Sequence, residues 1–287
     1  MFSDILLTVD FDRTLTGPDS TIPARNLEAI RYFTENGGTF TVNTGRSIPM
    51  SMRNILGKVP TNAPLLLYNG SAAYDDRTGK LTRYTPIDLD PTILLPQLQA
   101  RFPGLNLEVQ ALDAHYRFSE NPAWDAFSDH NQCARGFAQP GDDLGPFLKF
   151  SLYGEIRDVT VADLFIGSAS EIARMDAVEQ TLKDEFGAYC EVFRAAPRII
   201  DVHAKGVSKI AAARQLQKEL GKKILVCAGD AENDIPMLEG ADYAFCPADG
   251  VVANRFETVC NCADGAIADI IYKKIPEILG LSLDIPE

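Results

Sequence analysis

The chain opens with continuous apolar runs separated by segments of helical spacing. Residues 5–9 form the first run, and two carboxylates, Asp10 and Asp12, follow it directly. A run of this length with turn residues behind it is typical of a buried parallel strand. Residues 39–43 and 65–68 form two further runs, with helical patterns before and between them. This strand and helix order predicts a doubly wound parallel sheet.

The pattern changes near residue 75. Short alternating runs then predict strands at residues 83–87, 105–111, 115–119, 147–153, 162–166, 189–193 and 198–202. Only two good helices interrupt them, at residues 91–102 and 171–186. Strands with few helices between them favour an α+β module with a largely antiparallel sheet.

The doubly wound pattern resumes after this module. A helix is expected at residues 208–220, strands at 224–228, 242–246 and 257–260, and a closing helix at 266–279. The sequence therefore predicts an α/β fold, with a Rossmann-like doubly wound core made of residues 1–75 and 202–287. Residues 76–201 are expected to form an inserted α+β cap domain.

Charge and cysteine content narrow the possible partners and location. The 287 residues carry 27 Lys and Arg against 40 Asp and Glu, a net charge of −13. This balance argues against nucleic acid or an anionic membrane as a partner, although a small anion is compatible with local positive charge. No run approaches the ~18 apolar residues of a membrane span. The six cysteines include no CxxC pair, so we expect reduced thiols and a cytoplasmic protein.

Polar groups stand at the ends of several predicted strands. Asp10 and Asp12 follow the first strand, Thr44 the second, and Asp230 the strand at 224–228. The carboxyl ends of parallel strands meet at one edge of a sheet, so these groups are expected to converge. Two unpaired acids beside an apolar core are costly unless a cation compensates them. This set of groups suits phosphoryl transfer. The carboxylates can bind a divalent cation, the hydroxyl can bind a phosphate oxygen, and Lys205 or Lys209 supplies an ammonium.

Five sequence motifs make the chain similar to a known protein family. In chain order they are DFDRTLTG, VNTGR, YNGSAAYD, HAKGVSKI and VCAGDAENDIPML. In this order and spacing the chain resembles the haloacid dehalogenase-like phosphatase superfamily, and more narrowly its Cof-type members with a large inserted cap.

The resemblance implies a role for each acid. Asp10 would be the nucleophile that forms an aspartyl phosphate. Asp12 would protonate the leaving oxygen and then activate water. Mg²⁺, held by Asp10, the backbone carbonyl of Asp12 and Asp230, would offset the repulsion between carboxylate and phosphate.

The resemblance also implies which residues surround the phosphate. The implied phosphate-binding residues are Thr44, Gly45, Arg46 and Asn233, and the implied supporting residues are Asp234 and Asn69. Lys209 aligns with the family lysine after Gly206 and would neutralise charge on both phosphate and nucleophile. On the residues alone, Lys205 is the competing ammonium.

One residue departs from the family pattern. Arg13 stands where a glycine usually follows the second aspartate, and it narrows the backbone options of a loop that must wrap closely around phosphate. We expect the loop to be kept, with the Arg13 side chain directed outward or towards the cap.

The function implied is Mg²⁺-dependent hydrolysis of small phosphorylated metabolites, with sugar phosphates as the expected class. One alternative is a phosphomutase or another phosphotransferase, since an aspartyl phosphate can be handed to an alcohol instead of water. Another is a catalytically silent homologue that only binds a metabolite.

Overall fold

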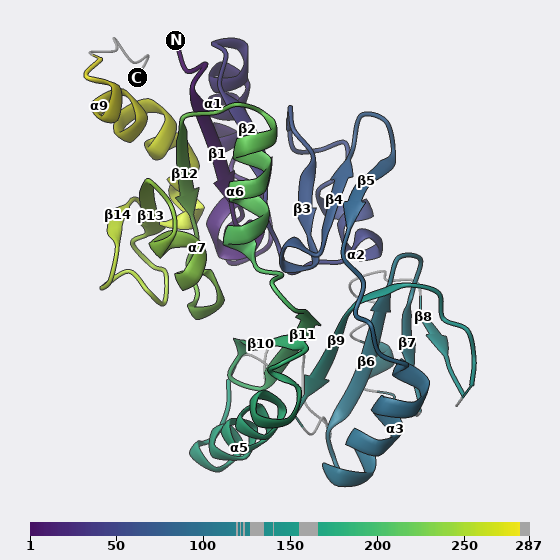
Figure 1. The fold of residues 1–287 in the computed structure, drawn as a ribbon. Helices are drawn as coiled ribbons and strands as arrows, with labels where there is room; N and C mark the ends of the chain where they lie inside the picture. The colour runs from purple at the N-terminus through teal and green to yellow at the C-terminus, as the bar shows by residue number, and fades with distance from the viewer. Residues whose placement is uncertain are drawn as a thin grey trace. The chain divides into compact units, whose positions relative to one another are not determined.

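The computed structural model describes residues 1–118, 120, 122, 124–126, 135–139, 141–154 and 166–281. The chain forms two compact units (Figure 1). The first unit comprises Met1–Gly45, Leu56–Arg83 and Ser208–Glu287, and the second comprises Arg46–Ile55 and Tyr84–Val207. The strand expected at residues 162–166 lies, apart from Ile166, outside the described residues.

A five-stranded parallel sheet forms the centre of the first unit. Its strands, in spatial order, are β14 (Glu257–Val259), β13 (Tyr243–Pro247), β12 (Ile224–Ala228), β1 (Ile5–Val9) and β2 (Thr39–Val42). Leu7 of β1 pairs with Val226 on one side and with Phe40 on the other. Every residue of β1 is buried, as its continuous apolar run predicts. The predicted parallel core sheet is confirmed, except that the third predicted strand, at residues 65–68, is not one of its five strands.

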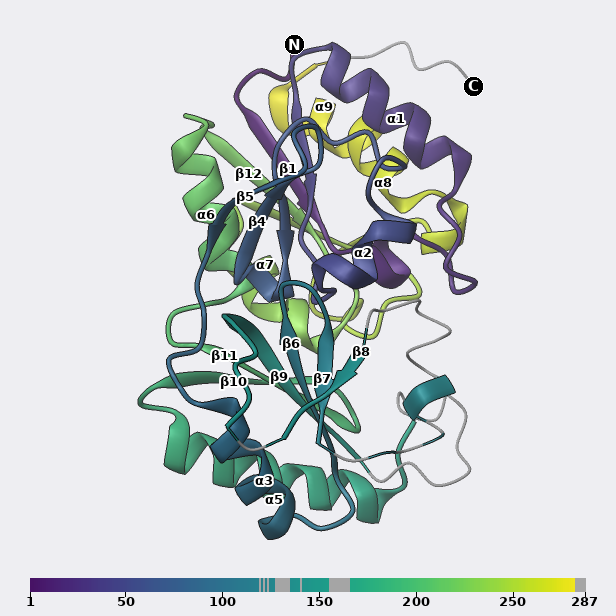
Figure 2. The ribbon, with the colours of Figure 1, turned by 90° about the vertical axis from the view of Figure 1, so that its right-hand side faces the viewer.

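Helices cover both faces of this sheet (Figure 2). On one side lie α1 (Ala24–Glu35), α8 (Ala266–Asp269) and α9 (Ile275–Leu279), and on the other lie α6 (Lys209–Glu219) and α7 (Ile235–Glu239). Leu216 of α6 and Met237 of α7 pack with Leu6 and Leu225 of the sheet in one apolar cluster. This cluster holds α6 and α7 against the sheet.

A second, smaller sheet corrects part of the strand prediction. It contains β3 (Leu65–Leu67), β4 (Ala72–Asp75) and β5 (Lys80–Tyr84). β3 pairs antiparallel with β4, and Leu66 also forms a parallel bridge with Asn43, which follows β2. The strand expected at residues 83–87 in the inserted module is therefore corrected, because β5 ends at Tyr84 and lies beside β4 in this smaller sheet.

The second unit contains a six-stranded sheet. Its order is β10 (Cys190–Ala196), β11 (Ile199–Ala204), β9 (Phe147–Tyr153), β6 (Asn106–Ala111), β7 (His115–Arg117) and β8 (Arg135–Phe137). All neighbouring pairs are antiparallel except β7 with β8. The predicted α+β module with a largely antiparallel sheet is confirmed.

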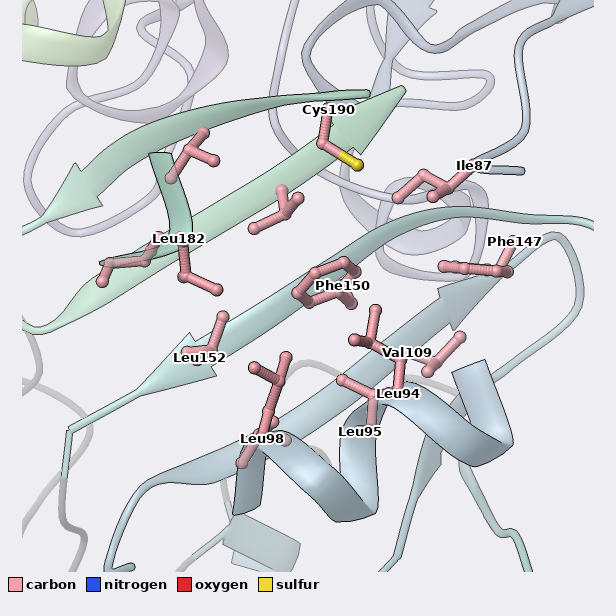
Figure 3. Close-up of a cluster of buried hydrophobic side chains, with 14 of the residues drawn as sticks. Ile87, Leu94, Leu95, Leu98, Val109, Phe147, Phe150, Leu152, Leu182 and Cys190 are labelled. Carbon is pink, nitrogen blue, oxygen red and sulfur yellow. The ribbon is translucent and has the colours of Figure 1, made fainter. Parts of the chain in front are cut away.

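The two main helices of this unit pack on one face of its sheet. They are α3 (Pro91–Arg101), capped by Asp90, and α5 (Ala169–Phe186), opened by a capping box of Ser168 and Glu171. Figure 3 shows Leu94, Leu95 and Leu98 of α3 against Val109 and Phe150. A short helix, α2 (Ile48–Asn54), belongs to the same unit. Among the described helices, none is long and apolar enough to cross a membrane.

Candidate active site

The first acidic segment leaves the sheet at the carboxyl end of β1. The backbone N–H of Asp10 donates to the carbonyl of Ala228 at 2.9 Å, which ties this segment to the end of β12. The chain then turns through Phe11–Leu15, with Asp12 extended and Arg13 in the left-handed region at φ 58°. Asp10 is only 7% exposed, so its carboxylate lies in a nearly dry environment.

A second acidic segment follows β12 and meets the first. The Thr14 hydroxyl donates to Oδ1 of Asp230 at 3.0 Å, and Asp230 is 4% exposed. Oδ2 of Asp234 accepts from the backbone N–H groups of Asp230 at 3.1 Å and Ala231 at 3.2 Å. A Cβ on Gly229 would lie 2.5 Å from the Asp234 Cβ, so only glycine permits this tight return of the loop. The 229–234 loop is thus built around the Asp234 side chain.

Lys209 joins the two acidic segments. It is the first residue of α6, which Ser208 caps by accepting from the Ala211 N–H at 3.1 Å. Lys209 Nζ lies 2.6 Å from Asp10 Oδ1 and 2.7 Å from Asp234 Oδ1, and its side chain is 3% exposed. Asn43 Nδ2 donates to the Lys209 carbonyl at 2.8 Å and fixes the helix start beside β2.

Lys205, the competing lysine, has different partners. Its Nζ donates to the carbonyl of Gly187 at 2.7 Å and lies 3.2 Å from Glu191, both in the second unit. Its side chain is 54% exposed. Lys209 is therefore the lysine that contacts the acidic cluster of the first unit.

Burial and like charge together set the protonation of the cluster. Burial raises the pKa of Asp10 well above its ordinary value; Lys209 opposes this, and the neighbouring acids add to it. Burial and repulsion by Asp234 raise the pKa of Asp230 to about 7, against the hydrogen bond from Thr14 and the charge of Lys209. Burial alone would lower the pKa of Lys209, but Asp10 and Asp234 outweigh it and raise that pKa.

The cluster offers ligands suited to a hard divalent cation. Asp10, Asp230 and Asp234 each present a carboxylate oxygen, and these oxygens all lie within 4.8 Å of one another. Mg²⁺ prefers such oxygen donors, and a dication would lower the cost of burying several carboxylates together. Both oxygens of Asp234 already accept hydrogen bonds. The donor set fits a divalent cation, with Asp10 and Asp230 as the acids best able to reach it.

Thr44, Gly45 and Asn69 come together at the end of β2. The Thr44 N–H donates to Leu66 and its carbonyl accepts from the Asn69 N–H, both at 2.9 Å. Asn69 adopts the left-handed region at φ 54°. A Cβ on Gly45 would lie 2.9 Å from Asn69 Oδ1, so the glycine allows a close approach.

Two further predicted phosphate-binding residues, Arg46 and Asn233, lie in different units. Arg46 is the first residue of the 46–55 segment, which belongs to the second unit. Asn233 lies in the Glu232–Asp234 turn of the first unit and is partly buried.

Two residues of this site were not singled out from the sequence. Thr14, which bonds Asp230, is the threonine of the DxDxT pattern, so its motif position was a usable signal. Asn43 ends the run at 39–43, and a polar residue at the end of a predicted buried strand is the hint that the sequence offers of its contact with Lys209.

Known proteins are similar to this chain in sequence. The family model for haloacid dehalogenase-like hydrolases matches residues 7–264. The 5-amino-6-(5-phospho-D-ribitylamino)uracil phosphatase YcsE of Bacillus subtilis (strain 168) is 24% identical over 276 residues, which cover 94% of each chain.

Solved structures agree on the fold. The haloacid dehalogenase subclass IIB sugar phosphatase BT4131 superposes with a TM-score of 0.73 at 17% identity, over 96% of this chain and 98% of that one. A HAD/COF-like hydrolase from Plasmodium vivax gives 0.75 at 22% identity, over 96% and 97%. The resemblance drawn from the motifs is confirmed at the level of the family: the chain belongs to the haloacid dehalogenase-like hydrolases.

Proposed function

We propose that this protein hydrolyses small phosphorylated metabolites in a Mg²⁺-dependent reaction that passes through a phosphoryl group on Asp10. The observation that carries the proposal is the contact between Lys209 and both Asp10 and Asp234, beside Asp230. One ammonium among several buried carboxylates leaves negative charge that a dication would balance. When bound, Mg²⁺ would offset the repulsion between the attacking carboxylate and the phosphate.

The chain's own residues supply the remaining chemistry. A carboxylate oxygen of Asp10 attacks phosphorus, and the bond from phosphorus to the leaving oxygen breaks while Asp12 gives that oxygen a proton. Asp12 then takes a proton from water, and the water oxygen attacks phosphorus. The bond between phosphorus and Asp10 breaks, which releases inorganic phosphate and regenerates both acids. Lys209 orients Asp10 and holds positive charge beside the reacting groups throughout.

Phosphate binding is proposed for Thr44, Gly45, Arg46 and Asn233. Thr44 and Gly45 lie in a tight backbone turn held by Asn69, an arrangement that favours hydroxyl and N–H donation to an anion. Asp234 plays a supporting part, since its side chain fixes both the 229–234 loop and Lys209.

Sugar or polyol phosphates are the proposed substrate class. One structural neighbour is described as a sugar phosphatase, and one relative as a phosphatase of a phosphoribitylamino compound. Both names point to a hydroxylated organic group that carries one phosphate. We propose that the inserted segment, residues 76–201, selects among such groups. A cytoplasmic location is also proposed, and it is supported by the free thiols of Cys190, Cys227, Cys246, Cys260 and Cys262.

A phosphate-release panel tests the proposal. Purified protein is incubated with sugar phosphates, polyol phosphates and an aryl phosphate, with Mg²⁺ or with EDTA, and free phosphate is measured. We expect release with Mg²⁺, loss with EDTA, and recovery when Mg²⁺ is returned. Transfer of phosphate to a second sugar with little free phosphate would favour a phosphomutase. No turnover of any compound would favour the silent metabolite-binding homologue.

A further inference from the structure

We infer that Arg13 is a built-in counter-charge that competes with a divalent cation for Asp230 and thereby weakens cation binding. This inference rests on the proposed cation site, and its experiment is chosen to separate the two. It concerns the residue that stands where the family pattern has glycine.

The Arg13 backbone adopts a conformation that is unfavourable for any residue with a Cβ atom. Its φ of 58° and ψ of 11° lie in the left-handed region, which costs a residue with a Cβ roughly 1 kcal/mol or more. The Arg13 N–H donates to the Thr16 hydroxyl at 3.2 Å, which helps to hold the turn. A glycine would adopt this turn freely, so the arginine is present despite a backbone cost.

The Arg13 side chain faces one particular oxygen of Asp230. Oδ1 of Asp230 accepts the hydrogen bond from Thr14, whereas Oδ2 lies 3.9 Å from Arg13 Nε. Oδ2 is therefore the oxygen better placed to take a cation, and it is the one beside the guanidinium.

The charge balance gives this contact a measurable consequence. In the fully ionised cluster, four carboxylates (Asp10, Asp12, Asp230 and Asp234) and two cations (Lys209 and Arg13) leave a net charge of −2. Without Arg13 the same group carries −3 and attracts a dication more strongly. Lys209 is buried and hydrogen-bonded on two sides, whereas the Arg13 side chain is 54% exposed and can turn into water as a cation arrives.

Direct cation binding tests the inference without any turnover assay. Full-length protein is freed of metal with EDTA, then titrated with Mg²⁺ by calorimetry and with Mn²⁺ by the electron paramagnetic resonance signal of the free ion. The variants are Arg13→Gln, which removes the charge; Arg13→Gly, which also frees the backbone; and Arg13→Lys, which keeps the charge. Arg255→Gln is the matched control, because Arg255 pairs with Glu239 at 2.8 Å and both side chains are about half exposed.

We expect Arg13→Gln and Arg13→Gly to bind both ions about tenfold more tightly than the wild type, which is ~1.4 kcal/mol. Arg13→Lys and Arg255→Gln should stay close to the wild-type affinity. Equal affinity in all variants would overturn the inference and leave the proposed cation site intact. Tightening in Arg13→Gly alone would also overturn it, since that result assigns the effect to the backbone. No binding of either ion to any protein would overturn the cation site as well.

Discussion

Lys209 Nζ lies 2.6 Å from Asp10 Oδ1, although the two residues are 199 positions apart in the chain. The contact joins the end of β1 to the start of α6, and the same ammonium holds Asp234 at 2.7 Å. An ammonium with two buried carboxylate partners holds the two acidic segments together and also balances their charge. Its removal should therefore affect stability and turnover together.

Replacement of Lys209 by methionine should destabilise the first unit. The substitution leaves Asp10 and Asp234 buried without their cation, and breaking one side of a buried charge group costs about 3–5 kcal/mol. Urea unfolding followed by circular dichroism measures the loss. Phosphatase turnover should fall by roughly 100-fold or more.

Lys205→Met is the control for this experiment. The Lys205 side chain is 54% exposed, and its ion pair with Glu191 is of a kind that contributes less than about 1 kcal/mol. A large loss of turnover in Lys205→Met, with Lys209→Met active, would reverse the assignment of the two lysines.

Gly70→Ala should disturb the same site through the backbone. Gly70 has a φ of 100°, and a Cβ there would lie 2.6 Å from the carbonyl oxygen of Ser208, directly before Lys209. The helix start must shift, so we expect a loss of more than about 2 kcal/mol in unfolding free energy, together with reduced turnover.

Gly57→Ala provides a matched comparison. Gly57 has a φ of 71°, but nothing lies within 4 Å of the added Cβ. This variant carries backbone strain alone, of about 1 kcal/mol, and should keep full turnover. If both variants lost the same stability and kept full activity, the close approach of Gly70 to Ser208 would not matter for function.

His203 should make the second unit sensitive to acid. Burial lowers the pKa of His203 to about 3 from an ordinary 6.5, with Asp201 opposing and Lys149 adding to the shift. The folded state thus keeps His203 neutral where the unfolded chain binds a proton. The stability due to this group is complete above pH 6.5 and is lost as the pH falls towards 3.

His203→Gln should remove this acid dependence. Fluorescence of Trp124, the sole tryptophan and a buried residue of the second unit, can follow urea unfolding at several pH values. Between about pH 6.5 and pH 4 we expect the wild type to lose roughly 2–3 kcal/mol more than the variant. Parallel losses in both proteins would show that His203 does not carry the effect.

The strand ends of the core could be predicted because their signal is local. The runs before Asp10 and Asp230 are continuously apolar, and such runs predict central parallel strands whose ends share one edge. The contact of Lys209 with Asp10 could not be predicted in the same way. It depends on where α6 begins relative to β1 and β2, which Asn43 fixes from a distant part of the chain.

The errors and omissions arise where tertiary packing decides. β5 alternates like a strand of the second unit, and its sequence does not reveal that it lies beside β4 in the smaller sheet. Glu108 alternates with apolar residues in β6 as an exposed acid would, yet it is 1% exposed. It accepts hydrogen bonds from Trp124 at 2.7 Å and Gln110 at 3.1 Å, and it pairs with His115 at 2.9 Å. Burial of a polar sheet face depends on which segments cover it, and no local pattern encodes that.

The central claim is that Asp10 carries the phosphoryl group during turnover. Borohydride reduces an acyl phosphate to an alcohol, so an acid-quenched reaction treated with borohydride should contain homoserine in place of Asp10. Peptide mass spectrometry detects the change. We predict homoserine at position 10 only when both substrate and Mg²⁺ are present, and none in Asp10→Asn, which should fold normally without turning over. Homoserine at another aspartate, or unmodified Asp10 in an enzyme that is turning over, would contradict the account.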